Sequence, residues 1–441
     1  MSDELIPVPL TWGQRAILGT IDQLGSGGDY FNILRVVPLP EYIAPAQIRK
    51  LVTTVTTENS ALRTLALRSG PHLFQHTVAP ETIRVEVYET GGNVLARARA
   101  VAANLAAAPI DHAAQPPVRW AAVTSQKGEA ALAIAASHFA VDAYALALLV
   151  RRVTELAADA SAEQCSVWQP RAQALQESTP GAAVRTSRAI DRWKRVTGQV
   201  PASACCVPDK RDRPDRFVEW SLDSVDMVAA STRVATRTGS SLASVVLAVW
   251  CIAIGVLDGR SAASMTLISG NRVREYERRY VGPMAQDTAM CVEWSALLAF
   301  DDFVSQVHRE ALSAYADGKY DPEALAASLG ASSGEVRPPR KILTFFNDAR
   351  GQPSHMSTTG ASPLAGEPRR LGAWPMLDLA RFLMLQETPM GCRLRLLVDT
   401  EYVEDRRVPE LLLAIENAVI AGAEARTVDD VRSTFSARFA E

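Results

Sequence analysis

The chain of 441 residues lacks the cysteine and histidine spacing of a metal site. Its six cysteines form no Cys-x-x-Cys motif and lie beside no paired histidines; they are Cys165, Cys205, Cys206, Cys251, Cys291 and Cys392. The adjacent pair Cys205–Cys206 is more typical of two free thiols than of a redox or metal site. The cysteine pattern therefore predicts a protein of the reducing cytoplasm that binds no metal.

The sequence also lacks the apolar segments of exported and membrane proteins. Residues 1–7 contain no basic stretch followed by an apolar one, so no signal peptide is visible. The longest apolar run, Val245 to Leu257, is too short to span a bilayer and predicts a buried helix instead. We therefore expect no membrane partner.

An excess of charge of one sign is missing as well. The chain has 46 Lys and Arg against 49 Asp and Glu, interspersed along its length, for a net charge of −3. A nucleic-acid surface needs a basic stripe, so we expect no nucleic-acid partner. Hydrophobic residues make up 48% and charged residues 22%, which is typical of a globular protein, and the length predicts two domains or lobes.

One stretch stands out among what is present. Residues 137–143 read Ser-His-Phe-Ala-Val-Asp-Ala and follow the apolar run 130–136, which predicts a buried strand. Helical spacing begins after Asp142, so His138 lies where a strand ends and a helix begins, a place from which an imidazole can reach a cleft and move protons. Asp142 is by default a helix N-cap, and a single histidine near a strand end is often only structural.

Hydrophobic periodicity predicts strands and helices in both halves of the chain. In the first half we expect helices at 12–21, 45–57, 92–107 and 143–158, strands at 31–38, 120–124 and 129–136, and a set of antiparallel strands at 65–67, 72–78 and 83–88. In the second half we expect helices at 189–196, 224–238, 242–257, 300–315 and 408–423, with strands at 217–222, 264–268, 341–346, 382–386 and 392–399. The polar stretch 161–183 separates these halves, and we place the boundary between residues 1–178 and 179–441.

Several pieces of sequence, taken in order, resemble one known family. They are Leu10-Thr11 with Gln14, Leu62-Arg63-Thr64 with Gln75, residues 137–143, Trp193, Gly270 to Arg272, Val281-Gly282 and Asp399 to Val403. Together they resemble the condensation domains of nonribosomal peptide synthetases, in the chloramphenicol-acetyltransferase-like superfamily. Residues 137–143 fall where that family has His-His-x-x-x-Asp-Gly.

The resemblance implies an α/β fold of two chloramphenicol-acetyltransferase-like lobes in a V-shaped pseudo-dimer, with mixed sheets flanked by helices. The active-site tunnel would run through the junction, with His138 as the base or as the group that positions the reactants. Asp142 would pair with Arg272 from the other lobe, and the backbone at Ala143 would line the oxyanion region. The substrate would be a thioester on the phosphopantetheine arm of a peptidyl or acyl carrier protein, with a small-molecule or carrier-bound acceptor and no bound cofactor.

The sequence departs from the family pattern at a few positions. Ser137 replaces the first histidine of the motif, and a hydroxyl can hydrogen-bond but cannot fill the space of an imidazole. We expect Ser137→His to be tolerated. Ala143 replaces the motif glycine and needs a negative φ. In the segment near 280–290, which crosses between the lobes, Met284, Gln286 and Asp287 stand where Phe, Asn and Thr are usual.

Two functions remain open at this point. The first is a free-standing, monomeric condensation enzyme that forms an amide or ester bond in natural-product (antibiotic) biosynthesis, since we see no adenylation, carrier or thioesterase segment beside the domain. The second is a catalytically silent scaffold that recruits a carrier protein or a tailoring enzyme. The presence of His138 and of the expected Asp142–Arg272 pair favours the enzyme.

Overall fold

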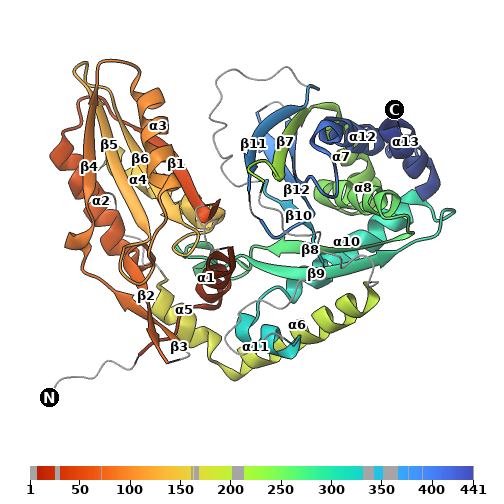
Figure 1. Ribbon diagram of the computed structural model, residues 1–441, viewed down its shortest axis with the longest axis horizontal. Coiled ribbons are helices and arrows are strands. Elements are labelled where there is room, and N and C mark those ends of the chain that lie inside the picture. The colour runs from red at the N-terminus through yellow and green to blue at the C-terminus, as the bar shows by residue number, and fades with distance from the viewer. Residues whose placement is uncertain are drawn as a thin grey trace.

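The chain is built from two mixed α/β halves, each with its own sheet. The structure is a computed structural model, and it describes residues 7–24, 30–70, 72–159, 162, 168–200, 213–330, 342–350, 366–375, 377–389 and 391–440. Figure 1 shows the two sheets on opposite sides of the molecule, with α1 (Trp12–Leu24) between them. Cys165, the Cys205–Cys206 pair and Lys341 lie outside the described residues.

The first half contains a four-stranded sheet covered on both faces. Its strands, in order across the sheet, are β1 (Asn32–Leu39), β6 (Ala130–Ser137), β5 (Val118–Ser125) and β4 (Val85–Thr90). One face packs on α3 (Val94–Ala107), and the other packs on α2 (Pro45–Glu58) and α4 (Ala143–Ala158). Every residue of β6 is buried, which confirms the buried strand predicted ahead of residue 137.

The expected antiparallel set at 65–88 is wrong in its last member. Strands β2 (Thr64–Ser69) and β3 (His72–Thr77) do form an antiparallel hairpin, as a sheet of their own. Strand β4, however, pairs in parallel with β5. Parallel neighbours need a long crossover connection, and the alanine-rich helix α3 between β4 and β5 supplies it.

The second half contains a seven-stranded sheet. In order across the sheet, its strands are β11 (Arg369–Trp374), β7 (Phe217–Ser224), β13 (Gly391–Asp399), β12 (Arg381–Thr388), β10 (Thr344–Asp348), β8 (Ala262–Ser269) and β9 (Gln286–Glu293). Apolar side chains of the sheet share one core with α7 (Asp226–Thr238), α8 (Leu242–Leu257), α10 (Phe300–Ala316), α12 (Val408–Ala421) and α13 (Val428–Ala440).

Helix α8 matches its sequence-based prediction, and its ends show why. Gly239 ends α7 in the left-handed conformation with φ 62°, and the Ser241 hydroxyl caps α8 by accepting the backbone N–H of Ser244.

In the described part of the chain, no single helix is long and apolar enough to cross a membrane. Helices α7 and α8, which meet at a 101° bend, are long and apolar enough only when taken as a pair, and only by length and composition.

Three further helices, α5 (Pro170–Glu177), α6 (Pro180–Gln199) and α11 (Pro322–Ser328), lie below the two sheets in the view of Figure 1. A short helix, α9 (Glu275–Arg278), follows β8. Helix α6 is anchored to the second half, because Arg192 pairs with Glu310 at 2.6 Å and with Asp317 at 2.9 Å. The turn between α5 and α6 contains residues 178 and 179, where we place the boundary between domains, and that boundary stays a prediction.

Candidate active site between the two halves

His138 is held at the point where β6 ends and α4 begins. Its backbone N–H donates to the carbonyl oxygen of Phe31 at 2.8 Å, which ties the turn to the start of β1. Asp142 is the N-cap of α4, because its Oδ1 accepts the backbone N–H of Ala145 at 2.7 Å. The backbone on both sides of His138 is therefore fixed, and with it the position from which the imidazole projects.

Asp142 also forms an ion pair with Arg272, which confirms the expected pairing. Nη2 of Arg272 lies 2.9 Å from both carboxylate oxygens, and both side chains are buried. Oδ2 of Asp142 accepts the backbone N–H groups of Met284 at 2.9 Å and of Ala285 at 3.3 Å. One carboxylate thus caps α4 and joins the first half to the backbone that leads into β9.

The charges in this cluster are set by burial and by these contacts. Burial alone would raise the pKa of Asp142, but the Arg272 guanidinium and the backbone N–H donors of Ala145 and Met284 lower it below its ordinary value. Burial lowers the pKa of His138, against the opposing effects of the Asp142 charge and of a hydrogen bond with the Val141 backbone. Near neutral pH the carboxylate is ionised and the imidazole of His138 is neutral, so it can accept a proton.

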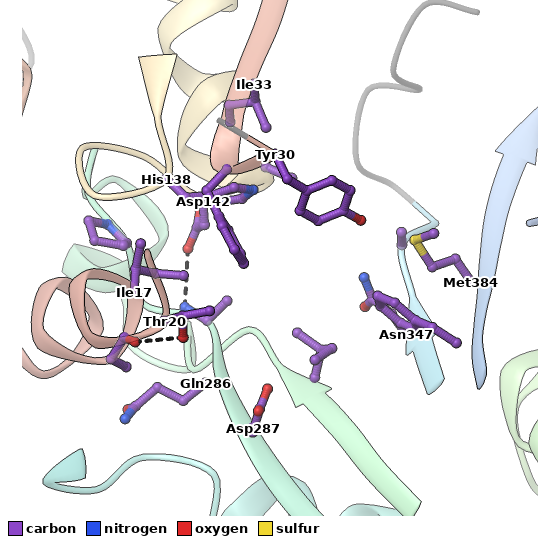
Figure 2. A pocket seen from close by; sticks show the side chains of 18 of the residues that line it. Ile17, Thr20, Tyr30, Ile33, His138, Asp142, Gln286, Asp287, Asn347 and Met384 are labelled. Carbon is purple, nitrogen blue, oxygen red and sulfur yellow. Dashed lines mark hydrogen bonds between the residues drawn. The ribbon is translucent and has the colours of Figure 1, made fainter. Parts of the chain in front are cut away.

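A cavity of about 720 Å³ lies beside this turn. His138, Asp142 and Ala143 line it. Its other walls come from both halves of the chain: β1, α1 and α3 in the first, and α6, α11, β8, β9, β10, β11, β12 and β13 in the second. Figure 2 shows His138 and Asp142 across the space from Asn347 and Met384. A neutral imidazole at the wall of a cavity of this size suits proton transfer with a bound organic substrate.

Comparison with known proteins assigns the family. A family model described as the condensation domain matches residues 7–340. The chain belongs to the condensation domain family. The condensation domain of the monacolin K polyketide synthase superposes with a TM-score of 0.77 at 15% identity, covering 96% of this chain and 99% of that one. A structure concerned with condensation domain-mediated chain release from the enacyloxin polyketide synthase superposes with a TM-score of 0.72 at 15% identity, covering 100% and 83%.

A relative known by sequence is much longer than this condensation domain. A plipastatin synthase polypeptide of Bacillus subtilis (strain 168) is 21% identical over 378 residues, which are 82% of this chain and 14% of that synthase polypeptide. The structural matches confirm the chloramphenicol-acetyltransferase-like α/β fold predicted from the sequence. Condensation domains in general are acyltransferases that use acyl or aminoacyl thioesters on carrier proteins.

The alanine in the motif of this condensation domain costs no backbone strain. Ala143 is the first residue of α4 and lines the cavity. Among the described residues, the non-glycine positions with positive φ are Tyr42 and Asn271, so φ at Ala143 is negative, as the sequence required.

The unusual residues before and within β9 have defined places. The side chain of Met284 is buried. The amide of Gln286 is buried too, and its Nε2 donates to the carbonyl oxygen of Tyr320 at 2.9 Å. Asp287 lines the cavity, and Figure 2 shows it on the β9 side of that space. Met284 and Gln286 are therefore packed inside the protein, and Asp287 adds a carboxylate to the wall of the cavity.

One residue of the site was missed by the sequence analysis. Nε2 of His112 lies 2.8 Å from Oγ of Ser137, inside the turn that carries His138. His112 stands in a loop between α3 and β5, and its only signal in the sequence is that it is one of six histidines. The two residues meet because the antiparallel pairing of β5 with β6 brings the start of β5 beside the end of β6.

Proposed function

We propose that this condensation domain forms an amide or ester bond. The donor is an acyl or aminoacyl thioester on the phosphopantetheine arm of a carrier protein, and the acceptor is an amine or alcohol that is free or carrier-bound. The observation that carries the proposal is the neutral His138 imidazole, held by the Asp142–Arg272 cluster at the wall of the cavity between the two halves.

His138 acts as the proton acceptor in this proposal. As the acceptor nitrogen or oxygen attacks the thioester carbonyl, a C–N or C–O bond forms and its proton passes to the imidazole. Collapse of the tetrahedral intermediate breaks the C–S bond, and the proton leaves with the thiol of the phosphopantetheine arm. No oxidant, metal or further reactant is needed to balance this step.

The N-terminus of α4 supports the position of the oxyanion. Ala143 begins that helix at the wall of the cavity, and a helix N-terminus stabilises negative charge. The carboxylate of Asp142 is already paired with Arg272, so it serves to hold the turn and not to take up a proton. Ser137 and Arg272 are supporting residues in this scheme.

A silent scaffold is the second candidate, and the replacement of the first motif histidine by Ser137 favours it. A scaffold would bind a carrier protein or a tailoring enzyme without using His138. The intact contacts of Asp142 with Arg272 and with the crossover backbone favour the enzyme, because they hold the His138 turn at the cavity.

The remaining features stay predictions: a free-standing monomer that acts in trans in antibiotic biosynthesis, in the cytoplasm. Of the described cysteines, Cys251, Cys291 and Cys392 are free thiols, which supports a reducing compartment.

The test is product formation, followed by mass spectrometry. Octanoyl and leucyl thioesters of N-acetylcysteamine, which mimic the end of the phosphopantetheine arm, are offered with a panel of amines and alcohols. We expect His138→Ala to slow wild-type product formation by roughly 10²–10⁴-fold without a change in melting temperature. The matched control is His76→Ala, an exposed histidine on β3, which should retain the wild-type rate. A His138→Ala protein that forms product at the wild-type rate would refute the proposed role.

A further inference from the structure

The turn that carries His138 is braced from inside by a second histidine. Oγ of Ser137 accepts the backbone N–H of Phe139 at 3.1 Å and lies 2.8 Å from Nε2 of His112. Ser137 is fully buried and His112 is 8% exposed. These contacts lie immediately before and after residue 138, so they act on the backbone from which the catalytic imidazole projects.

His112 is itself fixed by the parts of the fold around it. Its carbonyl oxygen accepts the backbone N–H of Ala66, on β2, at 2.8 Å. Its ring meets the ring of Phe139 edge to face, with 5.1 Å between the centroids. Phe139 is fully buried in a cluster that includes Leu10 and Leu18, under α1. The backbone of His112 thus holds the residue to β2, and its imidazole contacts Ser137 and Phe139 in the His138 turn, with Phe139 packed under α1.

The protonation state of His112 fits this role. Burial lowers its pKa to about 4, so the ring is neutral near neutral pH. A neutral imidazole has one N–H donor and one acceptor nitrogen, and a hydroxyl can both donate and accept. The contact with Ser137 is therefore satisfied in either tautomer.

We propose that His112 is a positioning residue that, through Ser137, sets the direction in which His138 enters the cavity. The family pattern has a histidine at the position of Ser137. In this chain His112, from the loop between α3 and β5, places an imidazole beside that position instead. The proposal rests on the proposed function of His138 for its effect on rate. Its effect on the orientation of His138 is independent of that function.

The geometry revises one expectation from the sequence. An imidazole is much larger than a hydroxyl, and the space around Ser137 is filled: the residue is fully buried, with Nε2 of the buried His112 2.8 Å from its Oγ. Ser137→His alone should therefore displace His112 and disturb the turn. The exchange Ser137→His with His112→Ser removes that clash, and we expect it to restore much of the lost activity.

The experiment compares His112→Phe with His112→Gln. Phenylalanine fills the space but cannot hydrogen-bond to Ser137, whereas the amide of glutamine can either donate or accept. We expect His112→Phe to lower kcat by about 10²-fold with little change in KM, because a displacement of about 1 Å has that effect. His112→Gln should stay close to the wild-type kcat. The matched control is His76→Phe on the exposed face of β3.

A second readout does not depend on activity. His138 lies edge to face with Phe31, with 6.0 Å between the ring centroids, so its NMR resonances report the orientation of its ring. The resonance is assigned by its loss in His138→Ala. We expect it to shift in His112→Phe and to stay near the wild-type position in His112→Gln. Should His112→Phe fail to fold, Ser137→Ala breaks the same contact from the other side.

The outcomes separate the two proposals. A shifted His138 resonance in a protein whose wild type shows no turnover would support the positioning role and count against the proposed function. An unshifted resonance in both His112→Phe and Ser137→Ala would overturn the positioning role, whatever happens to the rate.

Discussion

At the scale of single residues, the site depends on one carboxylate with several partners. Asp142 caps α4, pairs with Arg272 and accepts the backbone N–H of Met284. The pair with Arg272 could be predicted because both residues stand in recognisable stretches of sequence. The contact between His112 and Ser137 could not, because no motif marks His112 and only the pairing of β5 with β6 brings the two residues together.

Removal of one member of the buried pair should destabilise the protein strongly. We expect Asp142→Ala or Arg272→Ala to lower the free energy of unfolding by roughly 3–5 kcal/mol, because each leaves a buried charge without its partner. The double variant should recover part of that loss. The measurement is urea unfolding at neutral pH.

The matched control is an exposed ion pair between the first residue of α9 and the residue that follows the helix. Arg279 pairs with Glu275 at 2.6 Å with both side chains largely in solvent, so Arg279→Ala should cost less than about 1 kcal/mol. Small and additive losses at Asp142 and Arg272 would mean that the pair does not form in solution.

At the scale of helices and strands, elements with strong local signals were predicted and elements that depend on distant partners were not. The long apolar helix α8 and the buried strand β6 were expected from their sequences. Strand β9 was missed because it exists by pairing with β8 at the edge of the sheet. Strand β11 was missed because it is a partly exposed edge strand with a register shift between Arg370 and Gly372.

The packing of α1 on the crossover segment gives a test at this scale. A Cβ at Gly13 would lie 2.1 Å from the carbonyl oxygen of Pro283, next to the Met284 N–H that Asp142 accepts. We expect Gly13→Ala to lower stability by roughly 1–3 kcal/mol, because backbone must shift to make room. Gly198→Ala is the matched control on α6, where a Cβ has open space, and it should stabilise by about 0.5–1 kcal/mol. Equal effects of the two substitutions on thermal unfolding would show that α1 does not pack closely on this segment.

At the scale of the whole molecule, polar contacts tie α1 to α11 in the second half and to α5, the last helix of the first half. Arg15 on α1 pairs with Asp321 at 3.3 Å and with Glu323 at 2.8 Å, both at α11. Glu177 on α5 accepts the backbone N–H of Trp12 at 2.7 Å, and burial raises its pKa to about 7. These contacts could not be predicted from the sequence, because each joins residues more than 150 positions apart. Other residues of α1 and α11, among them Ile17 and Leu325, line the cavity beside His138.

The most direct test of the central claim, that His138 accepts the proton, is the pH dependence of single-turnover acyl transfer in the whole protein. The base must be neutral to act, and burial lowers the pKa of His138 below its ordinary value of 6.5. We therefore predict a rate that is constant above neutral pH and falls as the pH drops through that lowered pKa. In His138→Ala the residual rate should be roughly 10²–10⁴-fold lower and should lose this acid limb. A His138→Ala protein that keeps both the wild-type rate and the same acid limb would contradict the account.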